Sequence, residues 1–103
     1  MITPLDKKNF DNFISPKGKR VVEFSASWCV PCQIIKPIIE EISDENPDLQ
    51  LGLVDVDESY EIAVQYGIRS VPAFLIFEDG EAVRMNSQIG SKSYLTKVLT
   101  GTV

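Results

Sequence analysis

Two cysteines separated by two residues, in Trp28-Cys29-Val30-Pro31-Cys32, constrain this chain more than any other feature of its sequence. They follow a run with strand character, residues 19–24, and precede an apolar segment with helical spacing, residues 34–42. Two sulfurs at i and i+3 at the start of a helix can close a small disulfide ring or remain an open dithiol. The helix dipole and the unpaired N–H groups at that end favour a thiolate. The pattern therefore indicates redox chemistry.

Composition argues against several other classes of protein. With 103 residues, 44% hydrophobic and 24% charged, the chain fits a single domain, residues 1–103, with a core of its own. The net charge of -5 and the scatter of ten basic residues argue against binding of nucleic acid. The one basic cluster, residues 17–20, fits a solvated loop better than a phosphate site. Since histidine is absent, a His general base and a mixed Cys/His zinc site are excluded, and we expect no metal.

The termini and the cysteine count bear on location. Residues 1–6 show no charged leader followed by an apolar core, and no apolar run approaches the length that crosses a membrane. Two cysteines are also too few for a disulfide-stapled secreted scaffold. The sequence therefore predicts a cytoplasmic protein with no membrane partner, unless a leader has been removed from it.

The order of the predicted elements is typical of a mixed α/β fold. Apolar spacing, turn residues and helix caps predict helices over 6–14, 32–45, 60–66 and from 91 onward, and strands over 19–24, 49–56, 73–77 and 82–88, with a short first strand near Ile2. Pro37 lies inside the second helix, and we expect one bent helix there. The 49–56 strand should be central and the 82–88 strand an edge. These elements predict a sheet packed between helices.

Glu23 is the one discordant residue in the apolar run 19–24. On the run alone, the simpler interpretation is that its carboxylate points to solvent. The alternative is that the carboxyl group lies behind the cysteines with a raised pKa and handles their protons.

From end to end, the sequence resembles the thioredoxin family. The matching stretches are Val21-Val22-Glu23-Phe24, Trp28-Cys29-Val30-Pro31-Cys32, Pro37, Val54-Asp55-Val56-Asp57, Tyr66-Gly67-Ile68-Arg69-Ser70-Val71-Pro72, Phe77-Glu78-Asp79-Gly80 and Gly90. A lone Cys-x-x-Cys also fits a zinc site, whereas its combination with Trp28 and Val71-Pro72 is specific. The resemblance implies a thioredoxin fold, with a central mixed sheet of four to five strands flanked by helices on both faces. It also implies a cytosolic thiol–disulfide oxidoreductase that reduces protein disulfides, with no cofactor beyond a redox-active Cys29–Cys32 disulfide.

The resemblance further implies roles for matching residues. Cys29 corresponds to an exposed nucleophile that attacks a substrate disulfide, and Cys32 to a more buried residue that resolves the mixed disulfide. Glu23 occupies the place of a buried aspartate and is the candidate proton shuttle for Cys32. Pro72 matches a cis-proline that lies against the disulfide. The apolar face for partners would consist of Trp28, Val30, Pro31, Val71, Pro72 and residues 89–91, which include Gly90.

The implied partners are a thioredoxin reductase, of the flavin-NADPH or the ferredoxin type, and proteins that contain disulfides. The protein itself is expected to be a monomer. Two alternatives remain open. One is a specialised redox protein that serves one dedicated reductase or target, or acts as an oxidant. The other is a non-catalytic binding module, against which the intact cysteine pair argues, or a dimer bridged by a metal or a cluster, since two thiolates supply only half of a four-cysteine site.

Three further positions depart from the commonest family pattern. Val30 stands where glycine is usual, so a β-branched side chain lies beside the attacking sulfur and could alter substrate approach and redox poise. Gln33 and Leu53 stand where a basic residue often occurs. The loss of positive charge should leave the Cys29 thiolate and an ionised Glu23 less stabilised.

Overall fold

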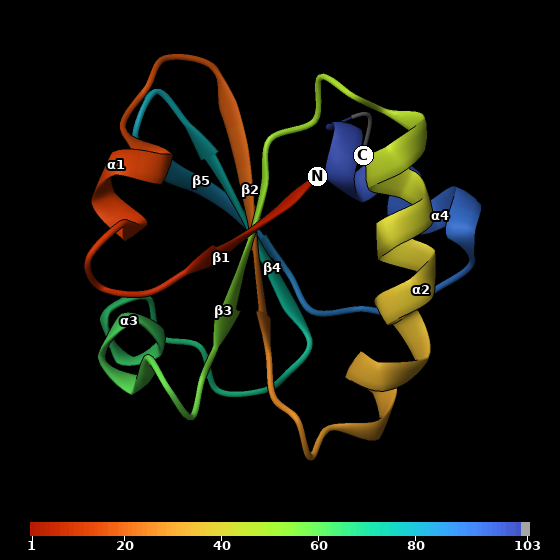
Figure 1. The fold of residues 1–103 in the computed structure, drawn as a ribbon, viewed down its shortest axis with the longest axis horizontal. Helices are drawn as coiled ribbons and strands as arrows, with labels where there is room; N and C mark the ends of the chain where they lie inside the picture. The colour runs from red at the N-terminus through yellow and green to blue at the C-terminus, as the bar shows by residue number, and fades with distance from the viewer. Residues whose placement is uncertain (102–103) are drawn as a thin grey trace.

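The computed structural model describes residues 1–101. In chain order, the elements are β1 (Ile2–Leu5), α1 (Phe10–Ile14), β2 (Lys19–Ser25), α2 (Val30–Glu45), β3 (Leu51–Asp55), α3 (Tyr60–Gln65), β4 (Ala73–Glu78), β5 (Glu81–Asn86) and α4 (Lys92–Thr100) (Figure 1). Every predicted helix and strand is present, including the short first strand. None of the helices in the described part of the chain has the length and apolar character needed to span a bilayer.

The five strands form one mixed sheet in the order β1-β3-β2-β4-β5. β3 runs parallel to β1 and β2, whereas β4 is antiparallel to both β2 and β5. β3 therefore lies inside the sheet and β5 at an edge, as predicted. In the view of Figure 1, α1 and α3 lie to the left of the sheet and α2 and α4 to its right. The predicted mixed sheet with helices on both faces is confirmed.

Each face of the sheet has its own apolar core, because alternate side chains of a strand point to opposite faces. On β2, Val22 and Phe24 pack in the core on the side of α1 and α3, while Val21 packs in the core on the side of α2 and α4. Glu23 follows Val21 by two positions and so shares its face. The alternation therefore places an acid under α2, the helix that starts at the cysteines.

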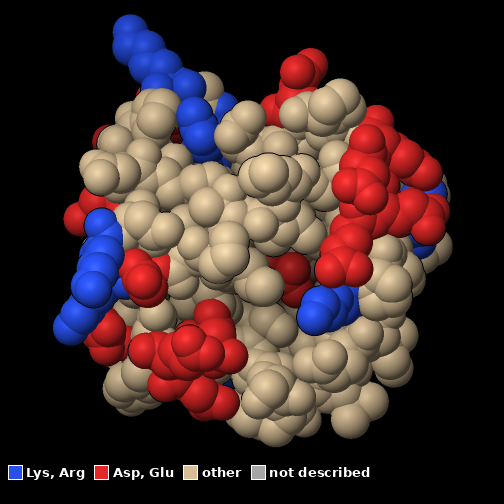
Figure 2. Space-filling model, viewed as in Figure 1, with Lys and Arg blue, Asp and Glu red and all other residues tan. Residues whose placement is uncertain are grey.

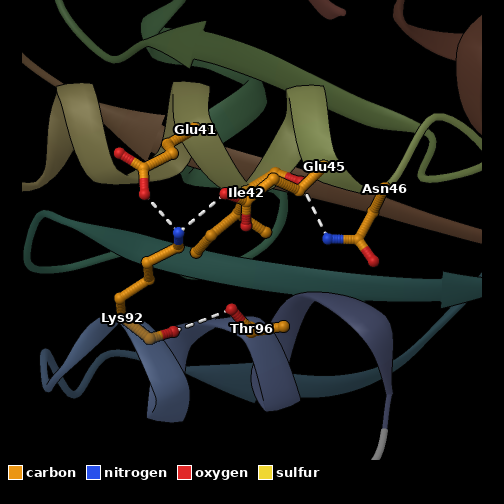
Figure 3. A network of polar contacts seen from close by, with 6 residues as sticks. All are labelled: Glu41, Ile42, Glu45, Asn46, Lys92 and Thr96. Carbon is orange, nitrogen blue, oxygen red and sulfur yellow. Dashed lines mark hydrogen bonds and ion pairs between the residues drawn. The ribbon is translucent and has the colours of Figure 1, made fainter.

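A polar clamp joins α2 to α4 (Figure 3). The ammonium group of Lys92, at the start of α4, pairs with the carboxylates of Glu41 and Glu45 on α2, at 2.9 Å from Glu45 Oε2. In the same view, Asn46 Nδ2 donates to the carbonyl oxygen of Ile42 at 2.8 Å and closes the end of α2. Since the ion pair is largely exposed, it aligns the two helices more than it stabilises them.

The first helix is shorter than predicted. It begins at Phe10 and not at Asp6, because the side chains of Asp6 and Asn9 close a turn before it. Asp6 Oδ1 accepts the N–H of Lys8, and Asn9 Oδ1 accepts the N–H of Asp6, both at 2.8 Å. Side-chain acceptors of this kind compete with helical hydrogen bonds, so the apolar spacing alone overestimates the length of the helix.

Candidate active site

Cys29 and Cys32 lie where β2 leads into α2 and are joined by a disulfide, with Cα atoms 5.2 Å apart. Cys29 is the N-cap residue of α2, and its Sγ accepts the backbone N–H of Cys32 at 3.2 Å. The spacing predicts a helix that begins at Cys32, whereas α2 begins two residues earlier, at Val30. Pro31 sits in the first turn, where its missing N–H group removes no helical bond. When the disulfide is reduced, this N–H group and the helix dipole stabilise negative charge on the Cys29 sulfur.

Both cysteines are buried in the disulfide form. Cys29 is 4% exposed and Cys32 is 2% exposed, so the contrast in exposure that the resemblance implies is nearly absent here. The two sulfurs differ instead in their surroundings. Cys29 Sγ lies 3.6 Å from the carbonyl oxygen of Val71, whereas Cys32 lines a cavity between α2 and strands β1 to β3.

The Val71–Pro72 peptide bond is cis, the geometry that the resemblance implies for Pro72. Pro72 is buried and immediately precedes β4. β4 pairs with β2 as far as Ala73 opposite Phe24, so the turn that carries Val71 lies beside the end of β2. The contact between Val71 and Cys29 follows from this pairing, and it joins two segments that are far apart in the sequence.

Glu23 is 5% exposed, so the interpretation in which its carboxylate points to solvent is wrong. It lines the same cavity as Cys32, which has a volume of about 340 Å³. Within residues 1–101 its carboxyl group has no hydrogen bond or ion pair. Burial raises the pKa of Glu23 to about 7. A carboxyl group with this pKa can take up and release a proton near neutral pH.

Sequence reasoning gave no site role to several polar residues that line this cavity, among them Ser25, Lys36 and Asp55. Ser25 follows Glu23 by two positions on β2 and pairs in register with Asp55 on β3. Lys36 follows Cys32 by one helical turn. The strand and helix periods indicate which side chains share a face. They identify the cavity residues only once β2 and β3 are known to be neighbours.

The interaction between Trp28 and Asp57 was also missed. Trp28 Nε1 donates to Asp57 Oδ2 at 2.8 Å, while 65% of the Trp28 surface remains exposed. Asp57 belongs to one of the stretches that carry the resemblance, but nothing in the sequence assigned it a partner. Its carboxylate fixes the orientation of the indole ring next to Cys29.

The residues predicted to contact partners lie at one end of the molecule. Val30 is 66% exposed, Pro31 and Gly90 are exposed, and Val71 is half-buried. Ile34, the first residue of the apolar segment 34–42, is 63% exposed one turn after Val30 and extends the apolar surface along α2. Figure 2 shows mostly uncharged side chains at the lower right, where β2 leads into α2, and an acidic cluster at the lower left.

A second group of acidic side chains lies on α2. In Figure 2, acidic side chains cluster over α2 on the right of the view. The exposed acids of that helix are Glu40, Glu41, Asp44 and Glu45. Among residues 1–101, no group of three or more Cys, Asp or Glu side chains is placed to hold a metal ion.

Comparison with known proteins gives consistent matches. The thioredoxin family model matches residues 1–100. A thioredoxin from Chlamydia pneumoniae is 33% identical over 99 residues, which is 96% of each chain. A thioredoxin from Bacillus subtilis is 37% identical over 84 residues, or 81% of each chain. The solved structure of a mutant thioredoxin from Halobacterium salinarum superposes with a TM-score of 0.86 at 28% identity, covering 97% of this chain and 88% of that one.

Proposed function

The chain belongs to the thioredoxin family, and on that premise we propose that it reduces disulfide bonds in other proteins. It is a thiol–disulfide oxidoreductase, and its redox pair is Cys29 and Cys32. The observation that carries the proposed roles is the position of Cys29 as the N-cap of α2, with the N–H of Cys32 donated to its sulfur. A sulfur in this position is the better nucleophile of the two, because the helix end stabilises its thiolate.

In the first step, the Cys29 thiolate attacks one sulfur of the substrate disulfide. A bond forms between Cys29 Sγ and that sulfur, the substrate S–S bond breaks, and the other substrate sulfur leaves as a thiolate that takes up a proton. The backbone of Val71, held by the cis bond to Pro72, is the proposed partner for an extended substrate segment. The distance of 3.6 Å between the Val71 carbonyl oxygen and Cys29 Sγ supports this role, because a segment paired with Val71 would lie next to the attacking atom.

In the second step, Cys32 attacks the Cys29 sulfur of the mixed disulfide. The bond between the two cysteines forms again, and the second substrate sulfur leaves as a thiolate, so that two electrons have passed from the dithiol to the substrate. The step is intramolecular and fast, because the two Cα atoms are only 5.2 Å apart. Cys32 must first lose a proton, and Glu23 is the proposed acceptor, because it shares the cavity of Cys32 and has a pKa of about 7.

As a thioredoxin, the protein works with a reductase and with protein substrates. We infer that the reductase is of the flavin-NADPH or the ferredoxin type. We also infer that partners dock on Trp28, Val30, Pro31, Val71 and Gly90. The large exposed apolar side chains of Trp28 and Val30 support this assignment, because such patches are typical of sites that bind other proteins.

We further infer that the protein acts in the cytoplasm, as a monomer of one domain over residues 1–103. A reductant of protein disulfides suits a compartment whose thiols are kept reduced. The use of both cysteines in one redox pair, with none left for structural bridges, supports this location.

Reduction of insulin by dithiothreitol tests the proposed function. We expect the wild-type protein to accelerate the precipitation of insulin chains, and Cys29→Ser to abolish the acceleration. A control variant, Lys7→Gln, changes an exposed residue in the turn between β1 and α1 and should match the wild type. A wild-type protein without activity would contradict the proposal.

A further inference from the structure

We propose that Tyr94 is a positioning residue for disulfide exchange, because it holds the loop that carries Gly90 in the conformation on which protein partners dock. Tyr94 lies in the first turn of α4, and the loop is residues 87–91, between β5 and α4. The inference rests on the proposed function, since it concerns how protein substrates reach Cys29.

The sheet brings this loop to the cysteine end of the molecule. β5 pairs with β4 as far as Asn86 opposite Phe74, which is two residues after Pro72. The loop therefore leaves β5 beside the cis-proline, and the turn before that proline contacts Cys29 through the carbonyl oxygen of Val71. A change in the loop is thus a change beside the cis-proline, whose preceding residue Val71 contacts Cys29.

The hydroxyl group of Tyr94 contacts the side chains of two residues where β5 leads into the loop, Asn86 and Gln88. It accepts a hydrogen bond from Asn86 Nδ2 at 2.8 Å and lies 3.4 Å from Gln88 Oε1, to which it can donate. Asn86 Oδ1 in turn accepts the backbone N–H of Gln88 at 2.9 Å. Both side chains of the loop entrance are therefore fixed to one tyrosine.

The ring of Tyr94 fixes the second half of the loop. A Cβ atom added at Gly90 would lie 2.8 Å from Tyr94 Cδ2, 3.1 Å from Cγ and 3.2 Å from Cβ, so the glycine backbone packs directly on the ring. The ring cannot swing aside freely, because its hydroxyl is held by Asn86 and its ring packs on the core between the sheet, α2 and α4. A side chain at position 90 would therefore collide with the Tyr94 ring. This requirement for glycine is separate from any space that a bound partner needs.

Tyr94 is itself anchored at the start of α4. Its backbone N–H donates to Ser91 Oγ at 3.1 Å, which is the N-cap bond of the helix. The cap, the ring and the hydroxyl together leave residues 87–91 little freedom before a partner arrives. A loop that is already ordered loses less conformational entropy on binding, so partners should bind more tightly than to a loose loop.

Tyr94→Phe tests the role of the hydroxyl, since the ring stays and only the bonds to Asn86 and Gln88 are lost. We expect KM for insulin reduction to rise about three- to tenfold, as for the loss of one net hydrogen bond, with a much smaller change in kcat. The rate with a small aromatic disulfide should fall less than the rate with insulin, because a small disulfide makes few contacts with the loop. The reduction potential of Tyr94→Phe is measured as well, because it shows whether the substitution has altered the cysteine pair itself.

Tyr66→Phe is the matched control. Tyr66 is half-buried on the other side of the sheet, where its ring contacts Phe10 and Phe77. No hydrogen bond of its hydroxyl is found within residues 1–101. Its loss should leave KM for insulin as in the wild type. If Tyr94→Phe and Tyr66→Phe gave the same KM as an active wild type, the positioning role of Tyr94 would be excluded, while the proposed function would stand.

A double-mutant cycle tests the contact between ring and glycine. Gly90→Ala should raise KM for insulin when Tyr94 is present, because the new methyl group displaces the loop from the ring. In a Tyr94→Ala background the same change should have little further effect, because the ring that it would strike has gone. Equal effects of Gly90→Ala in both backgrounds would overturn the inference and assign Gly90 to direct contact with partners. Thermal unfolding of each variant shows which of them remain folded.

Discussion

A carboxyl group without a partner is unusual inside a protein, and among the described residues 1–101 Glu23 is such a group. It lies between the sheet and α2, with 5% of its surface exposed, and burial alone accounts for its raised pKa. Since desolvation penalises the charged form, the folded protein favours the protonated acid at pH values where the unfolded chain has already ionised. The same property that makes Glu23 a suitable proton carrier therefore makes the protein less stable at high pH.

Glu23→Gln should remove this pH dependence. The folded pKa of about 7 lies above the ordinary value of 4.5, so the folded state binds more protons and the free energy of unfolding falls as the pH rises from 4.5 to 7. Below pH 4.5 both states are protonated, and above pH 7 the full penalty is present, of the order of 3 kcal/mol. We expect the oxidised variant to gain stability over the wild type by up to this amount at pH 8, and to gain far less at pH 4.5, as measured by urea unfolding.

Glu40→Gln is the control for this prediction, because Glu40 lines the same cavity from its exposed side. It should keep the pH dependence of the wild type. A difference between wild type and Glu23→Gln that is the same at pH 4.5 and pH 8 would show that Glu23 is not a raised-pKa acid in the folded protein.

The sequence alone could identify Glu23 as discordant, but it could not place the side chain. Whether an acid in an apolar strand faces water or the interior depends on which helix covers that face. Here α2 covers the face of β2 that carries Glu23. This is known only from the packing of Val21, on the same face, against that helix. Ile34 shows the converse case, because it belongs to the apolar segment 34–42 and yet 63% of its surface is exposed, one turn after Val30.

At the scale of elements, spacing predicted each helix and strand, and local hydrogen bonds set where they begin and end. Cys29 starts α2 earlier than predicted through a sulfur acceptor. β3 starts later, at Leu51, because the N–H of Leu49 donates to the carbonyl oxygen of Asn46 at 2.9 Å in a turn. Such bonds depend on side chains and turns that apolar spacing does not describe.

Gly52 illustrates a packing requirement that spacing also does not reveal. It lies on β3 opposite Thr3 of β1 and Val22 of β2. A Cβ atom there would collide with the side chain of Leu5 and lie 3.2 Å from the ring of Phe13, so the glycine allows β1 and α1 to pack closely on β3.

Gly52→Ala should therefore destabilise the protein by about 1–3 kcal/mol, as overpacking of a core does. Leu5→Ala alone should also destabilise it, by about 2–5 kcal/mol, because it leaves a cavity. Since the new methyl group fills that cavity, the double variant should lose less than the sum of the two single losses. Urea unfolding of the four proteins measures this coupling, and strictly additive losses would show that the two positions do not compete for the same space.

At the scale of the whole molecule, apolar and acidic side chains lie close together around the cysteines. Trp28 and Val30 are largely exposed, Asp57 holds the Trp28 indole, and further acids gather over α2 (Figure 2). This arrangement fits docking through apolar contacts near Trp28 and Val30 within a surface whose net charge is -5. The resemblance anticipated this docking face, but the bracing of Gly90 by Tyr94 became visible only from the contacts in the folded chain.

The order of the strands belongs to the same scale. The sequence predicted four or five strands and placed one inside the sheet and one at its edge. It could not show that β2 lies between β3 and β4. This order places Cys29 in contact with Val71, and Glu23 in the same cavity as Asp55. Long-range pairing of this kind is decided by how the two apolar faces are covered, and that is a property of the whole chain.

The central claim is that Cys29 attacks and Cys32 resolves, and trapping of the mixed disulfide tests it most directly. Reduced Cys32→Ser and Cys29→Ser are each incubated with a disulfide-containing protein, and the covalent adducts are located by peptide mass spectrometry under non-reducing conditions. We expect Cys32→Ser to accumulate an adduct through Cys29, and Cys29→Ser to accumulate little or none. An adduct that forms mainly through Cys32 in the Cys29→Ser variant would contradict it.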